Sequence, residues 1–254
     1  MKWFLQNKAN GLGNFIMATP AIYVLYKQYG PIPVYFATHS ISKLYQNCEF
    51  ISVLKNRPKI KPSWTSTRPK RRSHESDSEA LCRIVGHCGP VPPTYIDGIV
   101  TKKLKPKKQQ QVAVFHGCLG RAWKDKKNLG RKIRQLIIKL LLRRNMIPVI
   151  LGNSKDRNQY WCNNNLDGCV DYLGKLSLID SVSVLKQCDF FISNDTGLYH
   201  AAGAMEKPGM VIWKATSLIK NKSPFDGIEH IINKKLNVKV IKHAVADYLS
   251  KYII

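Results

Sequence analysis

The chain has 254 residues, of which 44% are hydrophobic, enough for one large α/β domain or two smaller ones with cores of their own. No apolar stretch is long enough to cross a bilayer, and the polar first residues do not resemble a secretory leader. The sequence therefore excludes a transmembrane protein and favours a cytoplasmic one that can lie at the inner face of the membrane. Lys and Arg number 41 against 16 Asp and Glu, a formal net charge of +25, which favours a polyanionic partner such as nucleic acid, a phosphorylated glycolipid or an acidic membrane surface. The alternative is that the solvent-exposed surfaces are simply rich in lysine, in which case the charge indicates no polyanionic partner.

The seven cysteines are an odd number and contain no Cys-x-x-Cys pair. A zinc site or a redox dithiol is therefore not expected, and the thiols are expected to be reduced and mostly buried.

The first half of the chain begins with a strand, a glycine turn and a helix. Residues 3–6 are apolar and predict the strand, Gly11 to Asn14 supply the turn, and residues 15–28 have helical spacing. A glycine and two prolines end the helix, and residues 33–37 predict the next strand. This order predicts an α/β fold with a parallel sheet.

A long basic segment then interrupts the pattern. Residues 55–77 are rich in proline and cations and have no periodicity, which predicts a loop. Trp64 within it could stack on a base or a sugar, lie at a lipid interface, or simply anchor the loop. Arg71 and Arg72 are its candidates for binding the acceptor of a reaction.

Polar, proline-containing sequence around residues 102–111 predicts a domain boundary, with an N-terminal domain at 1–104 and a C-terminal domain at 105–254. The last helix of the second domain could pack back on the first. The elements expected in this half are strands at 112–115, 147–151, 189–193 and 209–213, and helices at 129–144 and 238–252.

Two loops of the second half follow strands directly and are candidates for binding phosphate. Residues 193–200 enter a helix of small residues, and free amides there, with the Thr196 hydroxyl, could hold a diphosphate. Ordinary N-capping by Asp195 or Thr196 is the alternative, but it does not account for the whole octet. In residues 116–127, cations could neutralise charge on a leaving nucleotide diphosphate, although any single lysine there could equally be solvated surface.

These motifs resemble those of a known family. Residues 11–21, Gly-Leu-Gly-Asn-Phe-Ile-Met-Ala-Thr-Pro-Ala, are similar to the N-terminal signature of glycosyltransferase family nine, the heptosyltransferase-like enzymes. Residues 192–202 with Lys207 and Pro208 resemble the family's Ser-Asn-Asp-Ser/Thr-Gly-x-x-His-x-Ala-Ala and Gly-Lys-Pro run, and residues 173–189 resemble the segment before it. The resemblance covers about residues 1–54 and 112–216.

The resemblance implies a GT-B fold, in which two Rossmann-like domains with parallel sheets face each other across a cleft. It implies a hexosyl- or heptosyltransferase that inverts the sugar carbon, uses a nucleotide-sugar donor, and needs neither a cofactor nor a metal. The donor-binding residues that it implies are Lys126 or Lys124 for the diphosphate, the amides of Thr196, Gly197 and Leu198 for phosphate, Asp195 for donor hydroxyls, and His200. On the acceptor side the candidates are Gly11 and Gly13 of the turn, with Arg71 and Arg72.

The family's usual catalytic Asp is Asn14 in this chain, and an amide cannot accept the proton of the acceptor hydroxyl at neutral pH. Either Asn14 only positions the acceptor, or another residue is the base. The candidates are Asp195, His116, His39 and Glu75.

Three functions remain open from the sequence. The first is transfer to an anionic surface glycan or its lipid-linked precursor, such as a lipopolysaccharide core. The second is a DNA glycosyltransferase, of viral origin for example, that modifies hydroxymethylated bases and uses the positive charge to bind DNA. The third is a module that binds sugar or nucleic acid without catalysis. The donor sugar and the oligomeric state are not encoded in any motif that we recognise.

Overall fold

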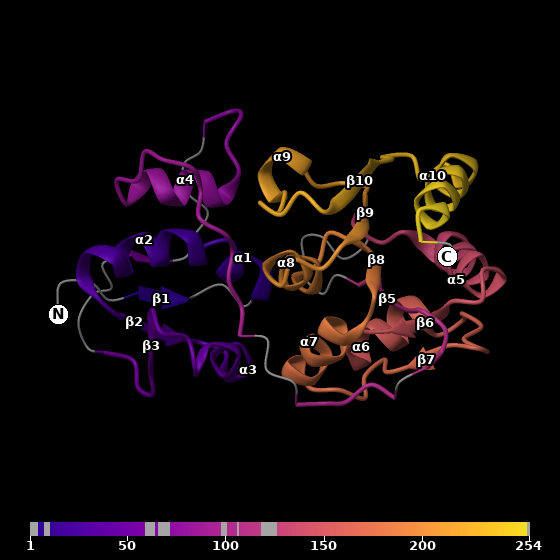
Figure 1. Cartoon of the computed structure of the whole chain (residues 1–254), viewed down its shortest axis with the longest axis horizontal. Helices are drawn as coiled ribbons and strands as arrows, with labels where there is room; N and C mark the ends of the chain where they lie inside the picture. Colours follow the sequence, from indigo (N-terminus) through magenta and orange to yellow (C-terminus); the bar gives the residue numbers. More distant parts are fainter. Residues whose placement is uncertain are drawn as a thin grey trace.

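The computed structural model describes residues 5–7, 11–58, 64–65, 72–97, 101–105, 107–117 and 126–252, with the backbone alone for 5–7 and 64–65. Two parallel sheets form two halves that lie side by side, the N-terminal half in indigo and purple and the C-terminal half in pink through orange to yellow (Figure 1).

The N-terminal sheet has the strand order β3-β2-β1-β4, and neighbouring strands pair in parallel. Its strands are β1 (Leu5–Asn7), β2 (Ile32–Phe36), β3 (Ile51–Leu54) and β4 (Trp64–Thr65). The helices of this half are α1 (Leu12–Ile16), α2 (Thr19–Tyr29), α3 (His39–Ser42), the short 3-10 helix η1 (Lys43–Tyr45) and α4 (Asp77–Ile84).

The helix expected over 15–28 is divided into α1 and α2. The chain turns between them at Met17 and Ala18, and the Thr19 hydroxyl donates a hydrogen bond of 2.7 Å to the carbonyl of Ile16. Because Pro20 lies in the first turn of α2, where it displaces no helical hydrogen bond, the second helix begins there. The segment 55–77, expected to be a loop, also contains a strand, because β4 lies within it and pairs with β1.

The C-terminal sheet has the order β10-β9-β8-β5-β6-β7, again with parallel pairing. Its strands are β5 (Gln111–Phe115), β6 (Ile147–Ile150), β7 (Val170–Asp171), β8 (Phe190–Asn194), β9 (Gly209–Trp213) and β10 (Ile228–Ile232). The helices are α5 (Gly130–Arg143), α6 (Ser154–Asp156), the π-helical turn η2 (Arg157–Trp161), α7 (Leu178–Gln187), α8 (Gly197–Ala204), α9 (Leu218–Asn221) and α10 (Val238–Ser250).

Helices cover both faces of the C-terminal sheet. In β5, Val112 and Val114 point to the core formed with α5 and α10, whereas Ala113 and Phe115 point to the core formed with α7 and α8. A central parallel strand that is buried on both faces has a continuous apolar sequence, which is why this strand could be predicted.

Among the described residues, the last helix packs on α5 of the C-terminal half and not on the N-terminal half, where the sequence had left its packing open. Its buried residues, including Ile241, Val245 and Leu249, lie in the core shared with α5, and the Arg144 guanidinium donates a 3.3 Å hydrogen bond to the carbonyl of Ala246. In Figure 1, α10 lies beside α5, on the side of the molecule away from the N-terminal half. The apolar stripe of α5 requires a cover, and α10 provides it.

The two halves contact each other through α1 and α8, and one continuous hydrophobic core includes Phe15 and Ile16 of α1 together with Ala201 and Ala202 of α8. The segment that joins the halves also contacts the second one, because the backbone amides of Thr101 and Lys102 donate to the Ser183 hydroxyl on α7. The site described below is therefore built on a packed interface.

The cysteines of the described part of the chain are all free thiols, as expected, but only three of these six are buried, namely Cys48, Cys82 and Cys188. Cys118 lies outside the described residues. Within those residues, no helix has the length and apolar character needed to cross a bilayer.

Candidate active site

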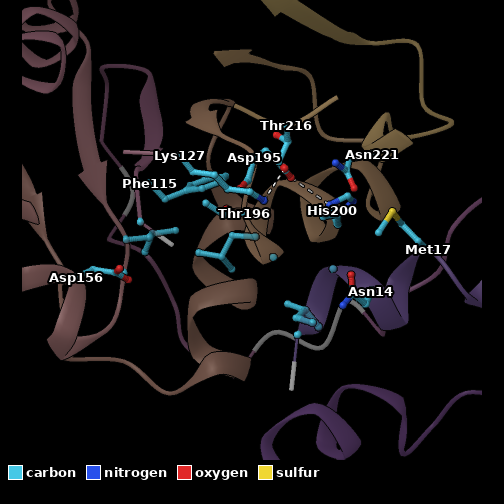
Figure 2. A pocket seen from close by; sticks show the side chains of 18 of the residues that line it. Asn14, Met17, Phe115, Lys127, Asp156, Asp195, Thr196, His200, Thr216 and Asn221 are labelled. Carbon is cyan, nitrogen blue, oxygen red and sulfur yellow. Dashed lines mark hydrogen bonds and ion pairs between the residues drawn. The ribbon is translucent and has the colours of Figure 1, made fainter. Parts of the chain in front are cut away.

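A cavity of about 1140 Å³ lies between the two halves (Figure 2). The N-terminal half lines it with residues of the turn into α1, with Met17 and with Asp77. The C-terminal half lines it with loops that follow β5, β6, β8 and β9 and with the start of α8. In a parallel sheet these are the carboxyl ends of the strands, where ligands bind in open α/β folds.

Asp195, directly after β8, carries the densest set of charged contacts in the cavity. Its Oδ2 lies 2.6 Å from the Lys127 ammonium, and its Oδ1 lies 3.5 Å from Nε2 of His200 (Figure 2). The residue is only 3% exposed. Burial by itself would raise the pKa of Asp195, but His200 and Lys127 outweigh it and hold that pKa well below its usual range.

Lys127 is held in place by the same strand end. The Asn194 side-chain amide donates to the Lys127 carbonyl at 2.9 Å, and the Lys127 ammonium lies 3.3 Å from the Asp195 carbonyl. The ammonium is thus fixed at the cavity wall, and Asp195 supplies the opposite charge.

Thr196 caps α8. Its backbone is extended and its hydroxyl accepts a 3.4 Å hydrogen bond from the Tyr199 amide. Gly197 and Leu198 follow in the first turn and line the cavity. First-turn amides have no carbonyl partner within their helix and carry the positive end of its dipole, so this wall can bind an anion.

Glycines bring the two halves close at the cavity. A Cβ on Gly13 would lie 2.4 Å from Cδ2 of His200, and a Cβ on Gly197 would lie 3.2 Å from Cβ of Leu12. Gly13 is therefore required by the close approach of the α1 turn to His200.

Asp156 is a further carboxylate of the cavity, at the end of the β6 loop. Its Oδ2 accepts a 3.0 Å hydrogen bond from the Asn153 amide, and a Cβ on Gly117 would lie 2.1 Å from its Oδ1. This Oδ1 is buried and has no hydrogen-bond partner among the described residues. Burial raises the pKa of Asp156 despite the hydrogen bond from Asn153.

A family model described as glycosyltransferase family 9 (heptosyltransferase) matches residues 58–244. The chain belongs to this family. It is therefore a glycosyltransferase, as the motifs of the sequence indicated. A search of curated protein sequences gives no match.

Solved structures agree on the fold of this family 9 enzyme. It is similar to the ADP-heptose lipopolysaccharide heptosyltransferase II of E. coli, with a TM-score of 0.71 and 14% identity over 99% of this chain and 100% of that one. It is also similar to E. coli heptosyltransferase WaaC, with a TM-score of 0.61 and 12% identity over 98% and 99%. The iron-containing dodecameric glycosyltransferase TibC of enterotoxigenic E. coli gives a TM-score of 0.75 and 13% identity over 100% and 77%. These likenesses confirm the GT-B fold that was expected.

The family 9 chain brings most of the predicted site residues into one cavity. Those that line it are Gly11, Gly13, Asn14, Asp195, Thr196, Gly197, Leu198 and His200. Lys126 is exposed and is not part of the lining, which contains its neighbour Lys127 instead. Lys124 and Arg71 lie outside the described residues, and Arg72 is exposed and away from the lining.

His116 lies inside the C-terminal half, away from the cavity lining. Its ring is buried and stacks on Trp161 with a centroid distance of 5.9 Å. Burial, with a smaller effect of Arg134, lowers the pKa of His116 to about 3. Because His116 follows β5 directly, its side chain points to the α5 side of the sheet and not into the cavity. This position argues against His116 as the base.

His39 and Glu75 are also outside the cavity lining. His39 is exposed at the start of α3. Glu75 pairs with Arg83 at 2.6 Å, and the hydrogen bond from Arg83, followed by one from the Arg72 amide, lowers the pKa of Glu75 to about 2. Such a carboxylate is a weak base.

Lys127, Asp77 and Asp156 line the cavity but were not predicted as site residues. Lys127 lies one residue from a predicted lysine, and Asp156 belongs to a capping box with Asn153 directly after a strand, a local signal that could have been read. Asp77 comes from the segment predicted as a loop. Among the described residues, no group of three or more His, Cys, Asp or Glu side chains is arranged to hold a metal ion.

Proposed function

We propose that this glycosyltransferase moves a hexose or heptose from a nucleotide-diphosphate sugar to an anionic acceptor of the surface-glycan or lipopolysaccharide type, with inversion and without a metal. The observation that carries the proposal is the pairing of the fixed Lys127 ammonium with the N-terminus of α8 on one cavity wall. Both features favour the two negative charges of a diphosphate.

The donor would lie along the C-terminal wall. Its diphosphate would accept hydrogen bonds from the first-turn amides of α8 and from Lys127, and hydroxyls of its sugar or ribose could donate to Asp195 and Asp156. Relatives of this fold have been solved with ADP and with ADP-heptose, which supports a nucleotide-diphosphate donor here.

Transfer then needs stabilisation of the departing diphosphate. As the bond from the sugar carbon to the diphosphate oxygen breaks, negative charge grows on that oxygen, and Lys127 with the helix dipole lies where it can be neutralised. The acceptor would enter from the N-terminal wall, beside Asn14, opposite the leaving group. Attack from that side inverts the sugar carbon.

The net charge of +25 favours one second candidate, the transfer of sugar to hydroxymethylated DNA. The two candidates differ in the acceptor alone, because they share the donor wall.

The test is an incubation of the purified chain with a panel of nucleotide-diphosphate sugars and two acceptors, a phosphorylated lipopolysaccharide-core oligosaccharide and hydroxymethylated duplex DNA. We expect release of nucleotide diphosphate and a gain of one sugar mass on the oligosaccharide. A gain on DNA alone, abolished by raised salt, would select the second candidate. Tight donor binding with no release on either acceptor would contradict both.

A further inference from the structure

Proton removal from the acceptor needs a base on the acceptor side of the cavity. Asn14 occupies that side, and its amide cannot accept a proton at neutral pH. Among the described residues that line the cavity, the carboxylates are Asp77, Asp156 and Asp195.

Asp195 is committed to the donor wall. Both of its oxygens face cationic or hydrogen-bonding groups, Lys127 at 2.6 Å and His200 at 3.5 Å. A carboxylate stabilised in this way has a depressed pKa and is a poor acceptor of a proton. It also lies where the diphosphate is expected, on the side from which the leaving group departs.

Asp156 lies at the far end of the cavity. In Figure 2 it is on the opposite side of the view from Met17 and Asn14, with Lys127 and Asp195 between. Its Oδ2 is already hydrogen-bonded to the Asn153 amide at the end of β6. A group in this place can contact the donor but not an acceptor that enters beside Asn14.

Asp77 is the carboxylate that the N-terminal half contributes to the lining. It is the first residue of α4, and it is 5% exposed although it borders the cavity. Ser76 before it caps the helix in a capping box with Glu79. The first position of α4 thus places Asp77 at the cavity, on the side of the N-terminal half.

The position of Asp77 is fixed against the α1–α2 junction. The next residue, Ser78, is buried and its hydroxyl donates a 2.9 Å hydrogen bond to the carbonyl of Met17. Met17 caps the C-terminus of α1, the helix that contains Asn14, and its amide donates to the Gly13 carbonyl at 3.0 Å. A small apolar cluster of Ala18 and Ala21 with Leu81 and Cys82 holds α4 against α2.

We propose that Asp77 is the general base of the transfer reaction. The inference rests on the proposed function. The acceptor oxygen forms a bond to the anomeric carbon, the bond from that carbon to the diphosphate oxygen breaks with its electron pair going to the diphosphate, and the hydroxyl proton goes to the Asp77 carboxylate. Asn14, on the same wall, orients the acceptor hydroxyl with its amide.

Asp77→Asn tests this role, with Glu79→Gln as the matched control, because both remove one negative charge from the first turn of α4. We expect kcat of Asp77→Asn to fall by about 10²- to 10⁴-fold, as is typical of the loss of a general base, with donor Kd unchanged. The decline of kcat at acidic pH, where the base becomes protonated, should disappear from what activity remains. Glu79→Gln should keep wild-type kcat, and Asp77→Glu should recover part of it.

A wild-type kcat in Asp77→Asn would overturn the proposal. A loss of donor affinity or of melting temperature in Asp77→Asn that Asp77→Glu shares would also overturn it, since the residue would then be structural. If the wild-type chain binds donors but transfers to no acceptor, the proposed function fails as a whole, whereas wild-type transfer with a fully active Asp77→Asn variant contradicts the base alone.

Discussion

At the scale of single residues, Gly13 shows how closely the two halves approach at the cavity. Replacing it by Ala places a Cβ 2.4 Å from Cδ2 of the buried His200 ring, whose neighbouring Nε2 lies 3.5 Å from Asp195. We expect Gly13→Ala to cost about 1–3 kcal/mol of unfolding free energy, as overpacking usually does, and to lower kcat/KM. Urea denaturation and steady-state kinetics measure these effects.

Gly11→Ala is the control for this prediction, because it lies in the same turn and its Cβ would make only an ordinary 3.5 Å contact with Asn14. It should remain within about 0.5 kcal/mol of the wild type. Equal effects of the two substitutions would contradict the close approach as the cause.

The sequence predicted Lys126 as the lysine that binds the donor diphosphate, whereas the structure places its neighbour Lys127 in the cavity lining. Lys127→Met removes the ammonium that pairs with Asp195, whereas Lys126→Met removes an exposed charge outside the lining. A hydrogen bond to a charged group contributes about 1.5–3 kcal/mol, so Lys127→Met should weaken donor binding by roughly 10- to 100-fold. Calorimetric titration with a nucleotide-diphosphate sugar checks this, and a larger loss in Lys126→Met would return the role to Lys126.

At the scale of elements, α10 stabilises the C-terminal half by covering α5. Leu249→Ala should cost about 2–5 kcal/mol, since Leu249 is fully buried in that core. Val240→Ala on the same helix changes a residue that is 50% exposed and should have little effect. Denaturant unfolding measures both, and a negligible cost for Leu249→Ala would contradict the packing of α10 described above.

The elements also show what the sequence could predict. The strands β5, β6, β8 and β9 were recognisable because each is a short apolar run buried on both faces. The two-residue strand β4 was not, because a strand of that length exists only through its pairing with β1. In the same way, β10 has a mixed sequence and depends on β9 beside it.

The residues of the candidate site likewise fall into those that a local motif predicts and those that only the fold brings to the cavity. Asp195, Thr196 and His200 are close together along the chain, so their motif was legible without the fold. Asp77 reaches the cavity only because α4 packs against α2, which no local pattern encodes. A histidine directly after a strand can turn toward either face of the sheet, and His116 turns toward the Trp161 core and away from the cavity lining.

At the scale of the whole molecule, buried neutral histidines predict a loss of stability in mild acid. Burial lowers the pKa of His116 to about 3 and that of His230 to about 4, from a reference of 6.5. Because the unfolded chain binds these protons first, the stabilisation is complete above about pH 6.5 and is lost as the pH falls toward 4. Each histidine contributes a slope of up to about 1.4 kcal/mol per pH unit.

His116→Phe keeps a ring against Trp161 and removes the titrating group, so it should flatten the dependence of unfolding free energy on pH in that window. His39→Gln, at an exposed position, serves as the control and should leave the dependence unchanged. Thermal melts from pH 4 to pH 7 provide the measurement, and an unaltered slope in His116→Phe would contradict the assignment.

The contact of Gly13 with His200 connects the walls of the cavity in an unbroken series, since His200 lies beside Asp195 and Asp195 beside Lys127. A donor that displaced Lys127 or Asp195 would act through His200 on the turn that holds Gly13 and Asn14. The donor and the acceptor would then be thermodynamically linked ligands, and the factor by which the donor changes the affinity for acceptor would equal the factor by which the acceptor changes the affinity for donor. A donor that strengthens acceptor binding would therefore itself bind more tightly once the acceptor is present.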